Sequence, residues 1–279
     1  MHVHWQTFEQ DGQTVEAQVF HPDTPSQKLI LFCPGFPGLG ATIFEQRHAA
    51  ELAEQGYDVV VIKHAGTRLD SGFGPMALNN AARLAQGRRD GEVHLGGGPS
   101  SVAAWLREPA IALQNLHVNY ADITVIGNSF GAVAALWSLL VGGAPAQAIH
   151  RLILMAGAQG VDSGAEGIMR IWNPVFLANS VIAQSISVDS PDSIVATMES
   201  AYADTNHRAA DLPAHIALTY LVVSNDELLS LKDTEAFKND VMKGRGDIVI
   251  DDMETAYPII GLTAHYMPNY PTNKLLELL

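Results

Sequence analysis

Cysteine, positive charge and long apolar runs are all scarce in this 279-residue sequence. Cys33 is the only cysteine, which excludes an intramolecular disulfide and gives no sign of an oxidising compartment. Lysine and arginine total 16 against 30 aspartate and glutamate residues, so the net charge is −14. Because an acidic surface repels phosphate backbones and anionic lipids, we expect neither nucleic acid nor a membrane as a partner.

Signals for export, membrane insertion and metal binding are also missing. Residues 1–6 contain no basic stretch followed by an apolar run, so no signal peptide is expected. The most apolar stretch, residues 133–141, is too short to span a bilayer and predicts a buried helix. Neither a His-Glu-x-x-His motif nor a paired-cysteine pattern occurs, so we expect no metal. These absences predict a cytoplasmic globular protein.

Apolar segments alternate with helical segments over most of the chain. Two segments rich in β-formers flank Asp11-Gly12 and predict an antiparallel hairpin: residues 3–9 and 15–20. Strands are expected at the apolar runs 28–33, 57–62, 122–126, 151–155, 216–224 and 247–252. Helices are expected at 44–55, 131–140 and 234–242, and after Pro271. This order predicts βαβ units, a mostly parallel sheet and an α/β fold.

Two segments break this alternation. Residues 63–101 are irregular and rich in glycine, with a short helix expected at 76–87, and Pro109 is expected to break the next helix or to begin a second one. Residues 160–213 contain helical stretches and no clear strand. We interpret them as a helical cap inserted into one core, residues 1–159 and 214–279. Trp172 and Phe176 of this cap could line a substrate pocket or pack within the cap.

One pentapeptide carries a chemical signal. Residues 127–131, Gly-Asn-Ser-Phe-Gly, fit the pattern G-x-S-x-G. The pattern alone is common by chance, but here it lies between a β-branched strand and a helix of small residues, as a nucleophile elbow requires. Glycines suit this position because the turn brings the strand and helix backbones close together. The context therefore predicts that Ser129 is a nucleophile.

Nearly the whole chain resembles the α/β-hydrolase superfamily, in which the nucleophile, the acid and the histidine follow one another along the sequence. Ser129, Asp226 after the strand at 216–224, and His265 before the last helix occur in this order. The resemblance implies an eight-stranded type of sheet with helices on both faces, and a Ser-His-Asp catalytic triad. It also implies an oxyanion hole made by the backbone N–H groups of Phe130 and Phe36.

The loop before Phe36 departs from the superfamily, since many relatives have His-Gly where this chain has Pro34-Gly35. The acid also has rivals. Asp162 follows an earlier strand, where some members place the acid, and Glu227 is adjacent to Asp226 but is expected to point away from the site.

Three further residues are candidates for a part in the site. Cys33 adjoins the same loop, but a buried, inert cysteine is the favoured interpretation. His64 and His94 could line a substrate entrance, with polar loop residues as the favoured alternative.

These residues favour a serine hydrolase that cleaves a carboxylic ester, with amides and thioesters as further candidate substrates. The reaction would pass through an acyl-serine intermediate on Ser129 and would need water but no cofactor. The expected partner is a small molecule with an acyl group. Two alternatives stay open: a lyase, cyclase or acyltransferase on the same fold, and a non-catalytic protein that binds small molecules.

Overall fold

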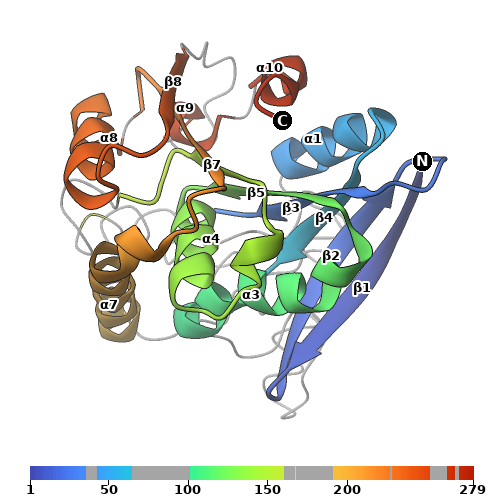
Figure 1. The fold of residues 1–279 in the computed structure, drawn as a ribbon, viewed down its shortest axis with the longest axis horizontal. Coiled ribbons are helices and arrows are strands. Elements are labelled where there is room, and N and C mark those ends of the chain that lie inside the picture. The colour runs from blue at the N-terminus through green and yellow to red at the C-terminus, as the bar shows by residue number, and fades with distance from the viewer. Residues whose placement is uncertain are drawn as a thin grey trace.

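The computed structural model describes residues 1–35, 43–64, 101–159, 167, 191–226, 228–251, 263–267 and 270–279. Within them, eight strands form one sheet in the order β1-β2-β4-β3-β5-β6-β7-β8 (Figure 1). The strands are β1 (His2–Gln10), β2 (Gln13–His21), β3 (Lys28–Cys33), β4 (Asp58–Lys63), β5 (Asp122–Asn128), β6 (Arg151–Met155), β7 (Ala217–Val223) and β8 (Asp247–Asp251). Each predicted strand is confirmed to within a few residues.

The sheet is antiparallel at one edge and parallel elsewhere. β1 and β2 form the predicted hairpin, and the turn residues Asp11 and Gly12 both have positive φ, as a tight hairpin turn requires. β2 pairs antiparallel with β4, and every later pair, from β4–β3 to β7–β8, is parallel. The mostly parallel sheet is therefore confirmed.

Helices fill the connections between the strands. The α-helices are α1 (Ile43–Glu54), α3 (Val102–Leu116), α4 (Phe130–Leu140), α7 (Pro191–Arg208), α8 (Leu231–Ala236), α9 (Thr263–Tyr266) and α10 (Thr272–Leu276). Short 3-10 segments are η1 (His117–Asn119), η2 (Ala146–Ala148) and η4 (Ala209–Asp211), and η5 (Phe237–Val241) is π-helical. The helix predicted at 234–242 therefore begins three residues earlier, at Leu231, and changes to π-helical geometry halfway.

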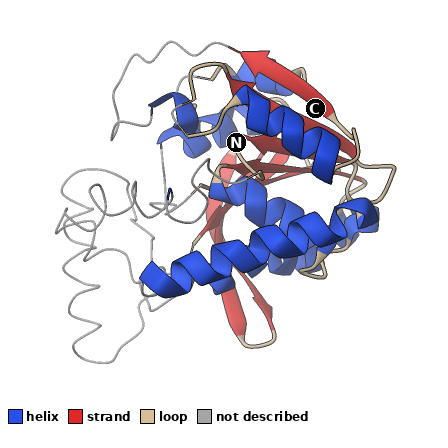
Figure 2. Cartoon of the chain, turned by 90° about the vertical axis from the view of Figure 1, so that its left-hand side faces the viewer, coloured by secondary structure: helices blue, strands red, loops and turns tan. Residues whose placement is uncertain are grey.

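Both faces of the sheet are covered, as predicted (Figure 2). Alternate residues of the central strands point to opposite faces, so that Leu29 and Leu31 join the cluster that contains α3 and α4. Ile30 and Phe32 join the opposite cluster, which α1 and α10 cover. Strands buried on both faces need apolar residues at every position, which explains the continuous runs in the sequence.

The prediction that Pro109 ends a helix is wrong, because α3 continues through it from Val102 to Leu116. Proline has no N–H and therefore removes one hydrogen bond from the helix. α3 is held against α4 in this region, where the Ser138 hydroxyl of α4 donates to the Leu106 carbonyl oxygen at 3.0 Å. Tertiary packing of the buried α3 face outweighs the local preference of proline.

Of the proposed cap, the structure describes Gly167 and residues 191–213. Helix α7 packs on α3 and α4, where Ile194, Met198 and Ala201 join a buried cluster with Trp105 and Phe130. The division into a core and a cap stays a prediction, and the helix expected at 76–87 lies outside the described residues. Among the helices that are described, none is long and apolar enough to cross a membrane.

Candidate active site

Ser129 occupies a strained turn between β5 and α4. Its backbone has φ 52° and ψ −118°, a region that a residue with a side chain rarely adopts. The turn is fixed to the neighbouring strand, because the Ser129 N–H donates to the Met155 carbonyl oxygen at 2.8 Å. Such strain persists only where the surroundings enforce it, and it makes this serine a candidate for function.

Two glycines of the pentapeptide allow the turn to close. A Cβ atom on Gly127 would collide with the backbone of Gly131, and one on Gly131 would collide with the carbonyl group of Cys33 at the end of β3. Gly157, after β6, serves the same purpose, since a Cβ atom there would collide with the Ser129 carbonyl oxygen. Sequence analysis did not predict that residue 157 must be glycine. The only indication in the sequence was a glycine directly after a strand.

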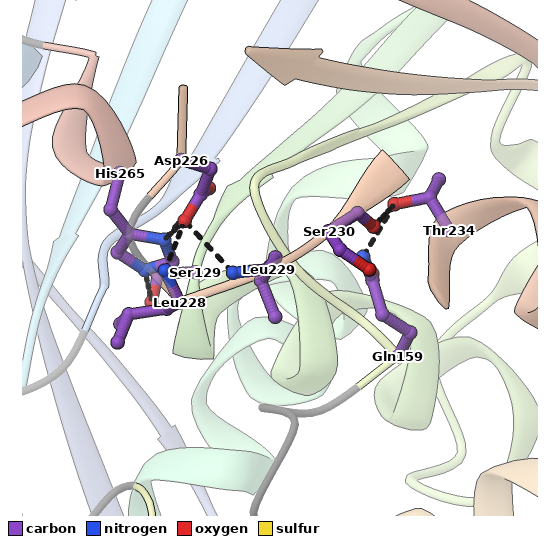
Figure 3. Close-up of polar contacts among 8 residues, drawn as sticks. All are labelled: Ser129, Gln159, Asp226, Leu228, Leu229, Ser230, Thr234 and His265. Atoms are coloured by element: carbon purple, nitrogen blue, oxygen red, sulfur yellow. Dashed lines mark hydrogen bonds and ion pairs between the residues drawn. The ribbon is translucent and has the colours of Figure 1, made fainter. Parts of the chain in front are cut away.

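The structure brings together the three residues that the chain order predicts. His265 Nε2 lies 2.7 Å from Ser129 Oγ, and His265 Nδ1 lies 3.0 Å from each carboxylate oxygen of Asp226 (Figure 3). Ser129 comes from the end of β5, Asp226 from the loop after β7, and His265 from α9. The side chains of His265 and Asp226 are each only 2% exposed, so water screens their interaction weakly.

The Asp226 carboxylate is held by its own loop as well as by the imidazole. Its Oδ1 accepts hydrogen bonds from the N–H groups of Leu228 at 2.7 Å and Leu229 at 3.0 Å (Figure 3). An aspartate carboxylate can only accept hydrogen bonds. His265 Nδ1 must therefore carry the proton of that contact, which leaves Nε2 to accept from the Ser129 hydroxyl. This is the tautomer that a general base requires.

The structure places one of the two predicted oxyanion residues. Phe130 follows Ser129 directly as the first residue of α4, with its side chain buried. The other predicted oxyanion residue, Phe36, lies outside the described residues, as do the pocket candidates Trp172 and Phe176. The same holds for the rival acids Asp162 and Glu227 and for His94.

Cys33 is buried at the end of β3. Burial raises the pKa of its thiol, and the charge of Glu108 raises that pKa further. Both effects disfavour the thiolate, which is the reactive form of cysteine. These observations agree with the interpretation of Cys33 as an inert residue of the core.

His64 lies in the irregular backbone directly after β4, as expected for a loop residue, but it is buried rather than exposed to solvent. Its side chain is 2% exposed, and its Nδ1 lies 2.5 Å from Oε2 of Glu108, which is fully buried. The Glu108 contact was missed because the two residues are 44 positions apart. The available signal was a single glutamate on the apolar face of the helix at residues 102–116. Among the described residues, no group of three or more His, Cys, Asp or Glu side chains is placed to hold a metal.

Solved structures resemble this chain far more than sequences do. No protein-family model matches the sequence, and a search of curated proteins finds no match. A carboxyl esterase from Bacillus coagulans has a TM-score of 0.59 and 12% identity, with 90% of each chain covered. The thioesterase domain from the curacin biosynthetic pathway has a TM-score of 0.58 and 14% identity, covering 100% of this chain and 99% of that domain. An esterase from Pyrococcus furiosus has a TM-score of 0.58 and 13% identity, covering 100% of this chain and 92% of the esterase.

The strand order and these structural neighbours show the α/β-hydrolase fold, as the resemblance implied. At sequence identities of 12–14%, this similarity is evidence for the fold only. The fold alone does not determine the function, because one fold supports many activities.

Proposed function

We propose that the protein is a serine hydrolase that cleaves a carboxylic ester through an acyl-serine intermediate on Ser129. One observation carries the proposal. A strained serine at a strand-to-helix turn has its Oγ 2.7 Å from an imidazole nitrogen whose ring is oriented by a buried carboxylate. A nucleophile, a base and an orienting acid in hydrogen-bond contact form the unit that acyl transfer requires.

The reaction follows from these contacts. Ser129 Oγ attacks the carbonyl carbon of the substrate while its proton passes to His265 Nε2. The imidazolium, stabilised by Asp226, then protonates the leaving alcohol as the carbon–oxygen bond breaks and the acyl enzyme forms. Water, activated by the same nitrogen, adds to the acyl carbon. The carboxylic acid leaves and Ser129 regains its proton.

The tetrahedral intermediates carry a negative oxygen that needs fixed donors. We assign this task to the backbone N–H groups of Phe130 and Phe36, as the resemblance implies. Phe130 lies at the N-terminus of the 11-residue helix α4, where the helix dipole favours a negative charge. Loss of one such donor typically costs about 3 kcal/mol of transition-state stabilisation.

Esters are proposed ahead of amides because an alcohol leaves a tetrahedral intermediate more readily than an amine does. The structural neighbours include a carboxyl esterase and a thioesterase domain, which supports a small acyl-bearing molecule as the substrate class. Trp172 and Phe176 remain the proposed residues of an apolar substrate pocket. No step of the mechanism requires a cofactor.

The first test is covalent labelling. Wild-type protein is incubated with a fluorophosphonate and its intact mass is measured, beside Ser129→Ala and a control, Ser230→Ala. Ser230 lies in the same loop as Asp226, between β7 and α8, and its side chain caps α8. Its substitution leaves the proposed nucleophile in place. We expect one adduct on the wild type and on Ser230→Ala, and none on Ser129→Ala.

The outcomes separate the alternatives. A folded wild-type protein that takes no adduct would contradict the proposal and favour a binding protein on this fold. An adduct on Ser129→Ala would place the reactive group elsewhere. Where labelling succeeds, product analysis distinguishes hydrolysis from acyl transfer to another alcohol and from lyase or cyclase chemistry.

A further inference from the structure

A second buried histidine–carboxylate pair, His64 with Glu108, lies near the serine turn and is not used in the proposed reaction. His64 follows the end of β4, and Glu108 is on α3, with 2.5 Å between Nδ1 and Oε2. Their side chains are 2% and 0% exposed. Apolar residues of similar volume would fill this space without the desolvation cost of a polar pair. A polar pair at this depth therefore points to a role other than packing.

The contacts of His64 determine which nitrogen carries a proton. Its Nε2 lies 3.3 Å from the carbonyl oxygen of Pro34, which can only accept a hydrogen bond. Nε2 must therefore be protonated and donate to Pro34. A second proton lies between Nδ1 and Oε2, on either the imidazole or the carboxyl group. His64 thus connects the α3 carboxyl group to the backbone that follows β3.

On the side away from Glu108, His64 contacts two segments next to Ser129: the backbone after β3 and the start of α4. Pro34 is followed by Gly35, where a Cβ atom would lie 3.2 Å from Ser129 Cβ, so this backbone passes directly beside the nucleophile. The His64 ring is also in edge contact with Phe130, with centroids 5.5 Å apart. Trp105 stacks on the ring at 4.8 Å and 13°, which fixes its plane.

We propose that His64, held by Glu108, is a positioning residue for the oxyanion hole. It fixes the Pro34–Gly35 peptide and the start of α4 relative to each other, next to Ser129. The inference rests on the proposed function, since it gives this pair a task in the same reaction. Oxyanion donors stabilise a transition state only when their geometry is set beforehand, so a looser connection lowers kcat more than it changes KM.

Two substitutions at one position test the connection. A glutamine amide reaches the place of Nε2, whereas an asparagine amide reaches only that of Nδ1. His64→Gln can therefore still donate to Pro34, and His64→Asn cannot. With 4-nitrophenyl acetate, we expect His64→Asn to lose roughly 10- to 100-fold in kcat, less than the loss of a whole donor, with KM changed by less than about threefold. We expect His64→Gln to recover most of this loss.

A matched control separates positioning from stability. Ser138→Ala removes a buried hydrogen bond to the same helix, α3, without touching Pro34 or Phe130. We expect it to lower Tm and to leave kcat per active site unchanged. Equal kcat values for His64→Asn and the wild type would overturn the proposal. A correlation between the loss of kcat and the loss of Tm across His64→Asn, His64→Gln and Ser138→Ala would also overturn it.

If the variants do not fold, an NMR measurement on the wild-type protein tests the proposal. The Nε2–H proton of His64 should give a resonance protected from exchange, and phosphonylation of Ser129 should shift it. A signal that does not move on adduct formation would contradict the proposal. The two failures stay distinct: wild type without adduct or turnover contradicts the hydrolase, whereas an active wild type with an unmoved signal contradicts only the role of His64.

Discussion

Two buried histidine–carboxylate pairs flank Ser129, and they differ in what the second ring nitrogen meets. In both pairs, Nδ1 faces a carboxyl group and the side chains are no more than 2% exposed. His265 Nε2 faces the Ser129 hydroxyl, which can give up a proton. His64 Nε2 faces the Pro34 carbonyl oxygen, which cannot. The same pair of side chains can thus serve proton transfer or positioning, and the partner of Nε2 decides between them.

The largest effect is expected from removal of His265, the proposed general base. His265→Ala leaves the Ser129 hydroxyl without a base, so kcat should fall roughly 10⁶-fold, far more than for any substitution of His64. His215→Ala, at an exposed histidine, is the control and should retain full activity. Turnover of a soluble ester measures both. Comparable losses of kcat on substitution of His64 and of His265 would contradict the assignment of positioning to one pair and proton transfer to the other.

The next effect concerns the carboxylate of the same pair. Asp226→Asn keeps the shape of the side chain but no longer holds His265 in the tautomer that accepts the serine proton. We expect kcat to fall roughly 10⁴-fold with little change in Tm. Asp247→Asn, an exposed aspartate on β8, is the control and should behave as the wild type. Near-normal activity of Asp226→Asn would give the acid role to a rival such as Asp162.

The smallest effect concerns a third buried histidine, His48, whose Nδ1 faces the Thr272 hydroxyl at 2.6 Å. Burial, with a smaller contribution from Arg47, lowers its pKa from 6.5 to about 3. Because the unfolded state takes up this proton first, stability should fall as the pH drops from about 6.5 towards 3. Between pH 7 and pH 5 the loss is about 2 kcal/mol.

Urea unfolding at the two pH values measures this loss. His48→Gln cannot titrate, so its free energy of unfolding should change less between pH 7 and pH 5 than that of the wild type. An equal change in the two proteins would show that His48 is not the group responsible.

The sheet and the three catalytic candidates could be predicted because their signals are local. The strand at 28–33 is apolar at every position, and Ser129, Asp226 and His265 each follow or precede a recognisable element. The path of α3 through Pro109 could not be predicted in this way, since the packing that stabilises it comes from α4. The His64–Glu108 contact likewise joins the end of a strand to a helix, and no sequence pattern predicts that these two residues lie close together.

The distance along the chain between Ser129 and His265 has a consequence for the newly made protein. Ser129 and His265, the proposed nucleophile and base, are 136 residues apart. At about 5–20 residues per second, synthesis from one to the other takes roughly 7 to 27 seconds. During that time the β5–α4 turn can exist without a base beside it. The nascent chain therefore carries the Ser129 hydroxyl without its proposed base until α9, which contains His265, has been made.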